Sequence, residues 1–414
     1  CKARAHTIDG EVVQLINEHT HATCQMEQEA KLAYSSMKER ARTTEECNQA
    51  VVGRLITEMT PEACSYLPPQ DTIKRTLTSC KGAKADPLLL RLEDVTIPAD
   101  YASKKDGLRF LVFDSGDRFL IFCNPQMIEV LQKSKKWFAD GTFKVAPELF
   151  FQVYSLHCEV GGSVLPAAYM LLTRKNCPTY TRALSALIDE CGGVCEPGTM
   201  IVDYELAAIN AFKTVLSTSD VRGCFFHLSQ CVYRKVQSEG LQELYACDPR
   251  INLGARMIPA LSMVPRSDVE GIFTELASSV HSDLQPVMNY FEDTFIGRPT
   301  TGGRRDAQFQ VELCNHHDTV LLSDSKTTNS VEAWHRGFQA HVQCSHPSLW
   351  RFLEALQRED CMQLHRLAQL EMGQRFKLAT KYVKVSERLQ TLAREYDRNH
   401  ALRFLRGVAR NVSF

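Results

Sequence analysis

Three acidic residues, Asp140, Asp203 and Glu332, stand where a metal-dependent reaction would use them. Divalent ions such as Mg²⁺ are hard cations that prefer oxygen ligands, so carboxylates suit them. Two such ions, about 4 Å apart, can hold the attacking and leaving oxygens of a phosphoryl transfer. The three acids are therefore candidates for a phosphoryl-transfer site, although their separation along the chain does not prove it.

Each acid also has an ordinary structural interpretation. Asp140 begins an Asp-Gly pair, a common hairpin turn, although the unbroken alternation around it also fits a place within a strand. Asp203 ends an apolar stretch and precedes a predicted helix, where Asp is a good N-cap. Glu332 lies three residues after Asn329, which is a capping-box spacing. The residue types alone leave both interpretations open.

The elements that must position these acids follow from hydrophobic patterning. The β-β-β-α-β-α-β-α order that begins at residue 136 predicts an α/β fold with a mixed sheet. A hairpin is predicted before it, at 108–122, and the Gly161-Gly162 pair is a predicted tight turn. The predicted strands cover 136–143, 150–158, 163–172, 200–203 and 221–224, and the predicted helices cover 179–190, 204–216 and 226–237.

Helical patterning covers most of the remaining chain. Apolar residues at helical spacing predict helix over 27–60, and 240–325 is also mostly helical. Further helices are predicted from 330 and over 348–373, and the last forty residues read as a basic, peripheral helical tail. The predicted regions are 1–24, 25–107 (helical), 108–238 (first part of the α/β core), 239–326 (helical insertion), 327–375 (end of the core) and 376–414 (tail).

Composition places the chain among ordinary globular proteins. Of 414 residues, 44% are hydrophobic and 23% charged, and the longest apolar run is too short for a membrane-spanning helix. The first residues are polar and mixed, unlike a secretory signal, and the start at Cys1 suggests a fragment of a longer chain. The 16 cysteines are scattered, so we expect reduced thiols in the cytosol or nucleus.

Net charge argues against a strongly basic nucleic-acid-binding protein. The formal charge is −1 and the pI is about 6.9. Local basic surfaces remain compatible with this balance, and five residues are candidates for them: Lys133, Lys135, Lys136, Arg304 and Arg305.

Four motifs around the three acids resemble the Mutator-like element (MULE) transposase domain. They are Asp-Gly-Thr-Phe at 140–143, Val-Asp-Tyr-Glu-Leu-Ala-Ala at 202–208, Cys-Phe-Phe-His at 224–227 and Thr-Asn-Ser-Val-Glu-Ala-Trp-His at 328–335. The resemblance covers about 136–345. It implies a ribonuclease H-like fold with a helical insertion before the last catalytic helix.

The same resemblance implies roles and partners. Asp140, Asp203 and Glu332 would form a DDE triad that binds Mg²⁺ or Mn²⁺. The partners would be double-stranded DNA, as transposon terminal inverted repeats and as target, and further copies in a homodimer or higher oligomer. We expect a nuclear protein that has no membrane segment.

Cys224 and His227 match the family's Cys-x-x-His signature. A role for His227 beside the triad is our favoured interpretation, and a buried thiol with a satisfied imidazole is the alternative. Cys314 and His317 repeat the spacing, but they lie too far along the chain for a finger-like zinc loop.

The N-terminus resembles the end of a FLYWCH zinc finger. Cys1, His19 and His21 would supply three Zn²⁺ ligands, and the fourth would lie upstream of Cys1. A solvated His pair in a loop is the alternative interpretation.

The function implied is that of a DDE-type transposase, which cuts DNA at transposon ends and joins the freed 3′ hydroxyl to target DNA. The main alternative is a host-recruited descendant that regulates by binding DNA without cutting it. A ribonuclease or resolvase on the same fold fits less well, because the Cys-x-x-His motif and the insertion favour the transposase family.

Overall fold

The computed structural model describes residues 4–8, 11–17, 24–43, 46, 48–82, 92, 95–104, 107–116, 119–376 and 380–412. The chain divides into two compact units, Cys1–Leu89 and Leu90–Phe414, which are treated separately below. The predicted zinc ligands Cys1, His19 and His21 lie outside the described residues, so the finger stays a prediction.

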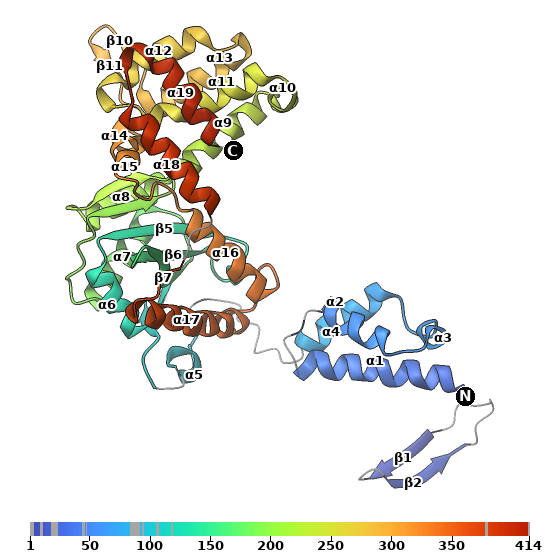
Figure 1. Ribbon diagram of the computed structural model, residues 1–414. Coiled ribbons are helices and arrows are strands. Elements are labelled where there is room, and N and C mark those ends of the chain that lie inside the picture. The colour runs from blue at the N-terminus through green and yellow to red at the C-terminus, as the bar shows by residue number, and fades with distance from the viewer. Residues whose placement is uncertain are drawn as a thin grey trace. The chain divides into compact units, whose positions relative to one another are not determined.

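The first unit contains a hairpin and a small helical cluster (Figure 1). The hairpin pairs β1 (Arg4–Ile8) with β2 (Glu11–Ile16). The predicted helix over 27–60 is two helices, α1 (Gln25–Thr43) and α2 (Asn48–Thr57), followed by α3 (Pro61–Cys64) and α4 (Gln70–Gly82). The apolar faces of α1, α2 and α4 share one core: Met37, Ala41, Val51, Val52, Ile73, Leu77 and Cys80.

A seven-stranded mixed sheet forms the centre of the second unit (Figure 1). Its order is β3-β4-β7-β6-β5-β8-β9. Only the β5–β8 and β8–β9 pairs are parallel, so the sheet is compatible with a ribonuclease H-like fold. The strands are β3 (Leu111–Asp114), β4 (Phe119–Cys123), β5 (Lys136–Thr142), β6 (Gln152–Val160), β7 (Ser163–Leu172), β8 (Thr199–Val202) and β9 (Asp220–Gly223).

Strand positions agree with the hydrophobic patterning to within a few residues. The predicted turn at Gly161-Gly162 joins β6 to β7, and both glycines have positive φ, which costs glycine little. One helix was not predicted, α6 (Pro125–Lys133), although Asn124 caps it by accepting from the Gln126 N–H at 2.9 Å.

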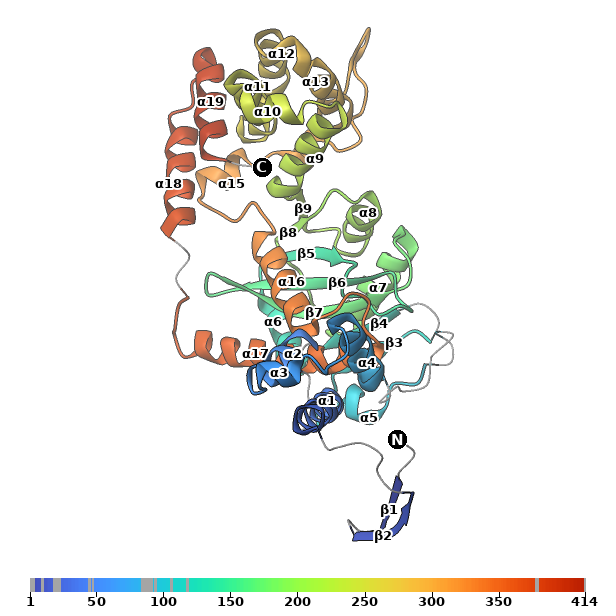
Figure 2. The same cartoon turned by 90° about the vertical axis from the view of Figure 1, so that its right-hand side faces the viewer.

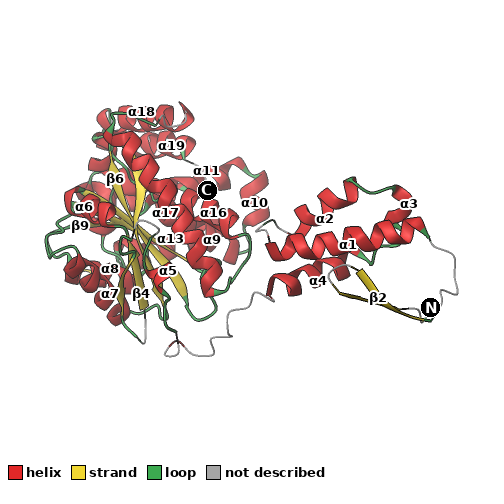
Figure 3. Cartoon of the chain, turned by 90° about the horizontal axis from the view of Figure 1, so that it is seen from below, coloured by secondary structure: helices red, strands yellow, loops and turns green. Residues whose placement is uncertain are grey.

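Helices cover both faces of the sheet (Figure 3). Side chains alternate across a strand. Trp137 therefore faces the large apolar cluster, whereas Phe138 on the other face packs with Val331 of the C-terminal region. The first face is covered by α6, α7 (Cys177–Glu190) and α8 (Leu206–Val215), and the second by α16 (Asn329–Val342) and α17 (Leu349–Glu371).

The predicted helical insertion separates β9 from α16, and the last two helices belong beside it. Helices α18 (Thr380–Arg394) and α19 (Ala401–Asn411) pack against α15 and α11, so this segment is not the peripheral tail we expected (Figure 2). Two short strands, β10 (Pro299–Thr300) and β11 (Gly303–Arg304), interrupt the insertion. The remaining helices are α5 (Ala99–Ala102), α9 (Phe225–Ser238), α10 (Gln242–Cys247), α11 (Pro249–Ala260), α12 (Val269–Ser279), α13 (Gln285–Phe291), α14 (Val311–Cys314) and α15 (His317–Leu321).

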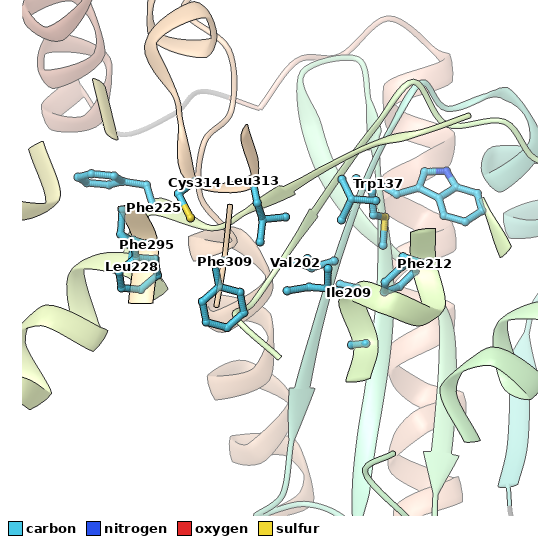
Figure 4. Packing of buried hydrophobic residues seen from close by; sticks show 14 of the residues in the cluster. Trp137, Val202, Ile209, Phe212, Phe225, Leu228, Phe295, Phe309, Leu313 and Cys314 are labelled. Carbon is cyan, nitrogen blue, oxygen red and sulfur yellow. The ribbon is translucent and has the colours of Figure 1, made fainter. Parts of the chain in front are cut away.

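One apolar core runs from the sheet into the insertion. Figure 4 shows Trp137 and Phe212 at the sheet, Phe225 at the start of α9, and Phe309 and Leu313 between them. Because the core is shared, the insertion is held firmly at the β8–β9 side of the sheet. Within the described part of the chain, no helix is long and apolar enough to cross a membrane.

Candidate active site

Asp140 lies inside strand β5 rather than in a turn. It pairs with Ser155 of β6, and only 7% of it is exposed. Its Oδ1 accepts a hydrogen bond from the Gly141 N–H at 2.9 Å. A Cβ on Gly141 would lie 2.7 Å from Oε1 of the buried Gln152, so a close approach explains this glycine. Strand alternation aims Asp140 at the face covered by α16.

Asp203 follows β8 directly, and it is not the cap of the next helix. Glu205 is the N-cap residue of α8. Burial, then the negative charges of Asp140 and Glu205, raise the pKa of Asp203 to about 7, which Lys175 partly opposes. Its Oδ1 is buried and has no hydrogen-bond partner among the described residues. A buried carboxylate oxygen without a hydrogen-bond donor is costly, so Asp203 is suited to bind a cation or a donor from outside the chain.

Glu332 is in the first turn of α16, and the capping-box interpretation does not hold. Thr328 is the N-cap residue, and Asn329 is already helical. Burial, then the charge of Asp140, raise the pKa of Glu332 to about 7. Its Oε1 lies 3.4 Å from Nε2 of His227 and has no hydrogen-bond partner in the part of the chain that the structure describes.

Asp140, His227 and Glu332 converge on one point. Each offers a ligand atom, and these atoms lie within 4.8 Å of one another. Among the described residues, this is the one group of three acids, cysteines or histidines with that metal-ligand spacing, and Asp203 is not part of it. Asp203 is near enough for its pKa to respond to Asp140. The structure thus brings together two of the three predicted acids and a family-motif histidine, with the third acid beside them.

His227 projects from the first turn of α9 toward Glu332. Burial is the main cause that lowers its pKa, while the negative charge of Asp140 opposes the shift. Its Nδ1 is buried and unpartnered within the described ranges. The ring is therefore close enough to orient Glu332 or to contribute a nitrogen to a cation.

Cys224 has a structural role at the same junction. Its Sγ accepts hydrogen bonds from Thr328, at 3.2 Å from the backbone N–H and 3.3 Å from Oγ1. Burial raises the pKa of the Cys224 thiol to about 11, so it stays protonated. The Cys-x-x-His motif thus joins the start of α9 to the start of α16 and brings His227 to Glu332. The repeat of its spacing, Cys314 and His317, is not part of the metal-capable group.

Sequence reasoning missed three residues: Ser155 and His335, which contact Asp140, and His157, which contacts Ser155. The signal for His335 was its spacing, because it lies three residues after Glu332 and so on the same helical face. Ser155 and His157 had no local signal, since only the β5–β6 register places them near Asp140.

Most of the cations expected to form basic surfaces are neutralised. Ion pairs join Lys133 to Glu129, Lys136 to Glu159 and Asp324, Arg304 to Glu270 and Glu292, and Arg305 to Asp293. Other exposed cations follow the strand ends near the site: Lys144 after β5, and Arg174 and Lys175 after β7, of which Lys175 is paired with Glu205.

A comparison with protein families identifies a resemblance in the region that carries this site. Residues 136–231 match the MULE transposase domain. The matched stretch runs from β5 into α9, so it contains Asp140, Asp203, Cys224 and His227 but ends before Glu332. No curated protein matches the chain. The MULE match supports a transposase-related function, and the position of Glu332 beside the matched residues comes from the tertiary structure.

Proposed function

We propose that this protein is a DDE-type DNA transposase of the MULE type, built on a ribonuclease H-like fold. Asp140, Asp203 and Glu332 are its catalytic acids. The observation that supports this most is the convergence of Asp140 and Glu332 with His227, from three elements far apart in the sequence. Its reaction is hydrolysis at a transposon end, which frees a 3′ hydroxyl that then attacks a phosphodiester of the target DNA.

The residues present fit a divalent cation. Two of the three ligand atoms in the group are carboxylate oxygens. Asp203 Oδ1 and Glu332 Oε1 are buried without a hydrogen-bond donor among the described residues. A cation held by Asp140, His227 and Glu332 would compensate the Glu332 oxygen, and oxygen ligands favour Mg²⁺ or Mn²⁺. The proposed triad adds Asp203, which lies outside this group of three. When bound, such an ion supplies Lewis-acid stabilisation of charge on the phosphoryl oxygens.

The chain's own groups supply position and charge. The Gly141 N–H holds Oδ1 of Asp140, and Nε2 of His227 on α9 faces Glu332 on α16. Each carboxylate is therefore oriented by a neighbouring group. Lys175 lies 3.1 Å from Glu205 and partly offsets the negative charge next to Asp203. These contacts pre-organise the acids before DNA arrives.

The DNA path we propose follows the exposed cations at this edge of the sheet. Lys144, Arg174 and Lys175 follow strand ends, and Arg336 is one helical turn beyond Glu332. Phosphate contacts of this kind position a duplex without reading its sequence. The proposed partners are transposon ends and target DNA, bound by a homodimer or higher oligomer in the nucleus, with the helices α1–α4 and a Zn²⁺-binding finger recognising the ends.

A cleavage assay tests the proposal. Duplexes carrying inverted repeats from the flanks of the gene are incubated with the purified protein and Mg²⁺ or Mn²⁺. We expect nicking that Asp140→Asn and Glu332→Gln abolish, whereas the exposed Glu129→Gln retains it. Equal cleavage by the two site variants and the unaltered chain would end the assignment of the acids.

The assay also distinguishes the alternative function. A host-recruited regulator would bind the same duplexes in EDTA and in Mg²⁺ but leave them uncut with either metal. Tight, specific binding without cleavage would therefore replace the transposase proposal with the regulator.

A further inference from the structure

A series of buried polar groups leads to the carboxylate of Asp140. His335 is 9% exposed, and its Nδ1 lies 3.5 Å from Oδ2 of Asp140. The other ring nitrogen, Nε2, lies 3.1 Å from Oγ of Ser155. The same Oγ lies 2.9 Å from Nε2 of His157. The order of the chain is therefore His157, Ser155, His335 and Asp140.

The number of hydrogens available fixes which group donates and which accepts along this series. A carboxylate only accepts, so a lone pair on Nδ1 of His335 would face Oδ2 of Asp140 and repel it. With the hydrogen on Nδ1, Nε2 of a neutral His335 accepts from the Ser155 hydroxyl, whose other acceptor, the backbone oxygen of Asp140, is farther away at 3.4 Å. The same hydroxyl accepts from Nε2–H of His157. A doubly protonated His335 also carries the Nδ1 hydrogen. Every arrangement that suits an ionised Asp140 thus points a donor at it.

His157 is suited to the far end of the chain. It is buried, and its ring lies 5.2 Å from that of Trp334 in an edge arrangement. Burial lowers the pKa of His157 well below its usual range, so it remains a neutral donor. Aligned donors in a dry region polarise one another, which strengthens the last contact.

We propose that His335 is a positioning residue for Asp140, held by Ser155 and His157 with a hydrogen on Nδ1. Two donors then fix the carboxylate plane, since the Gly141 N–H holds Oδ1 and His335 holds Oδ2. The 3.5 Å contact is longer than a full hydrogen bond, and contacts of this kind often tighten when a site is occupied. The consequence for a divalent cation at Asp140 rests on the proposed function, whereas the tautomer of His335 does not.

Two isosteric variants separate the two ring nitrogens. The amide nitrogen of Asn overlays Nδ1 of His, so His335→Asn keeps the donor to Asp140 and loses the Ser155 contact. The amide nitrogen of Gln overlays Nε2, so His335→Gln keeps the Ser155 contact and loses the donor. If His335 only filled space, the two variants would have similar effects.

Binding of Mn²⁺ to the full chain, followed by electron paramagnetic resonance, is the first measurement. We expect His335→Gln to weaken Mn²⁺ affinity roughly 10- to 100-fold, as for other groups that orient metal-ligating side chains. His335→Asn should stay within about threefold of the unaltered chain. The control is His365→Gln, at an exposed position on α17, which should change nothing. Equal affinities for the Asn and Gln variants, whether both reduced or both unchanged, would overturn the proposal.

A second measurement needs neither a metal nor a folded variant. Long-range ¹H–¹⁵N spectra of the histidine-labelled chain in EDTA report which ring nitrogen of His335 carries the hydrogen. We expect a hydrogen on Nδ1, and an Nε2–H tautomer with a bare Nδ1 would overturn the proposal. Nδ1–H in a chain that binds no Mn²⁺ would support the role of His335 and count against the proposed metal site instead.

Discussion

Two clusters of buried acids contact α16, and they differ in how well they are satisfied. On α17, Glu359 accepts hydrogen bonds from Trp334 Nε1 at 2.7 Å and Gln363 Nε2 at 2.6 Å, and its Oε2 lies 3.1 Å from Nδ1 of His341. Its neighbour Asp360 is paired with Lys104 and accepts from Asn124 at 3.3 Å. These two acids have donors supplied by the protein itself.

Two acids of the candidate active site, Asp203 and Glu332, each have an oxygen that lacks such a donor. Asp203 Oδ1 and Glu332 Oε1 are buried and unpartnered among the residues described, and burial, then the negative charge of Asp140, raises the pKa of both side chains. A folded chain keeps an uncompensated buried charge only where something else offsets the cost. The contrast teaches that burial alone does not mark a functional acid. Missing donors do not suffice either, because Glu205 Oε1 is also buried and unpartnered among the described residues; Glu332 differs in that it also converges with Asp140 and His227.

The largest expected effect is on chemistry. Glu332→Gln and Asp140→Asn should reduce cleavage of transposon-end DNA by roughly 10⁴-fold, as removal of groups that act as one unit does. Glu359→Gln should retain most of the activity, because Glu359 lies with its donors behind α16. Gel assays of nicked product measure all three variants, and a comparable loss in Glu359→Gln would erase the distinction between the clusters.

The next effect is on stability. Glu359→Ala removes the acceptor for Trp334 and Gln363 in a buried place, so we expect a loss of about 3 kcal/mol in the free energy of unfolding. Glu354→Ala is the matched control, since it lies on the same helix and its ion pair with Arg358 is largely exposed. That control should cost under about 1 kcal/mol. Urea titrations followed by circular dichroism give both values.

Low pH should destabilise the protein through His316, a buried histidine whose ring lacks hydrogen-bond partners among the described residues. Both ring nitrogens of His316 are unpartnered within the described residues, and burial, with Lys326 and Arg222 nearby, lowers its pKa to about 3. Between about pH 6.5 and 3 the unfolded chain binds a proton that the folded chain does not, so stability falls as pH falls. The loss at pH 5 is on the order of 2 kcal/mol.

The histidine contribution has a direct control. His316→Phe should flatten the acid limb of a plot of melting temperature against pH, while His157 keeps part of the slope in the same direction. An unchanged slope in His316→Phe would show that this histidine is not a source of acid sensitivity.

The smallest expected effect is on the free energy of unfolding, through the buried oxygen of Asp203 that has no hydrogen-bond donor among the described residues. Asp203→Asn removes one buried like charge, so the free energy of unfolding should rise by on the order of 1 kcal/mol without metal. Mg²⁺ should raise the melting temperature of the unaltered chain more than that of the variant, because ligands that bind the folded state stabilise it. Thermal scans with and without Mg²⁺ measure both, and a destabilised Asp203→Asn would contradict this account.

Local periodicity in the sequence predicted most of the secondary structure near the site. Alternation and helical spacing are properties of neighbouring residues, so the strands that became β5 to β9 and the helices that follow them were visible without a structure. The MULE-like motifs marked Asp140, Asp203 and Glu332 for the same reason, because each motif is short and contiguous.

Only the tertiary structure ruled out the turn and cap interpretations of the acids. Pairing with Ser155 places Asp140 inside a strand, and Thr328 and Glu205 take the caps that Asn329 and Asp203 were candidates to fill. Each of these outcomes depends on hydrogen bonds made at a helix start or across strands. The residue types alone allowed either outcome.

Contacts between distant segments were beyond the sequence altogether. Register places Ser155 opposite Asp140 and His157 opposite Phe138, and shared apolar burial brings α18 and α19 against the insertion. Glu270, Glu292 and other acids neutralise cations that looked like a basic surface. The sequence by itself determined which residues were available for chemistry. Long-range packing decided which of them meet and which lack a partner, because those properties depend on the arrangement of the whole fold.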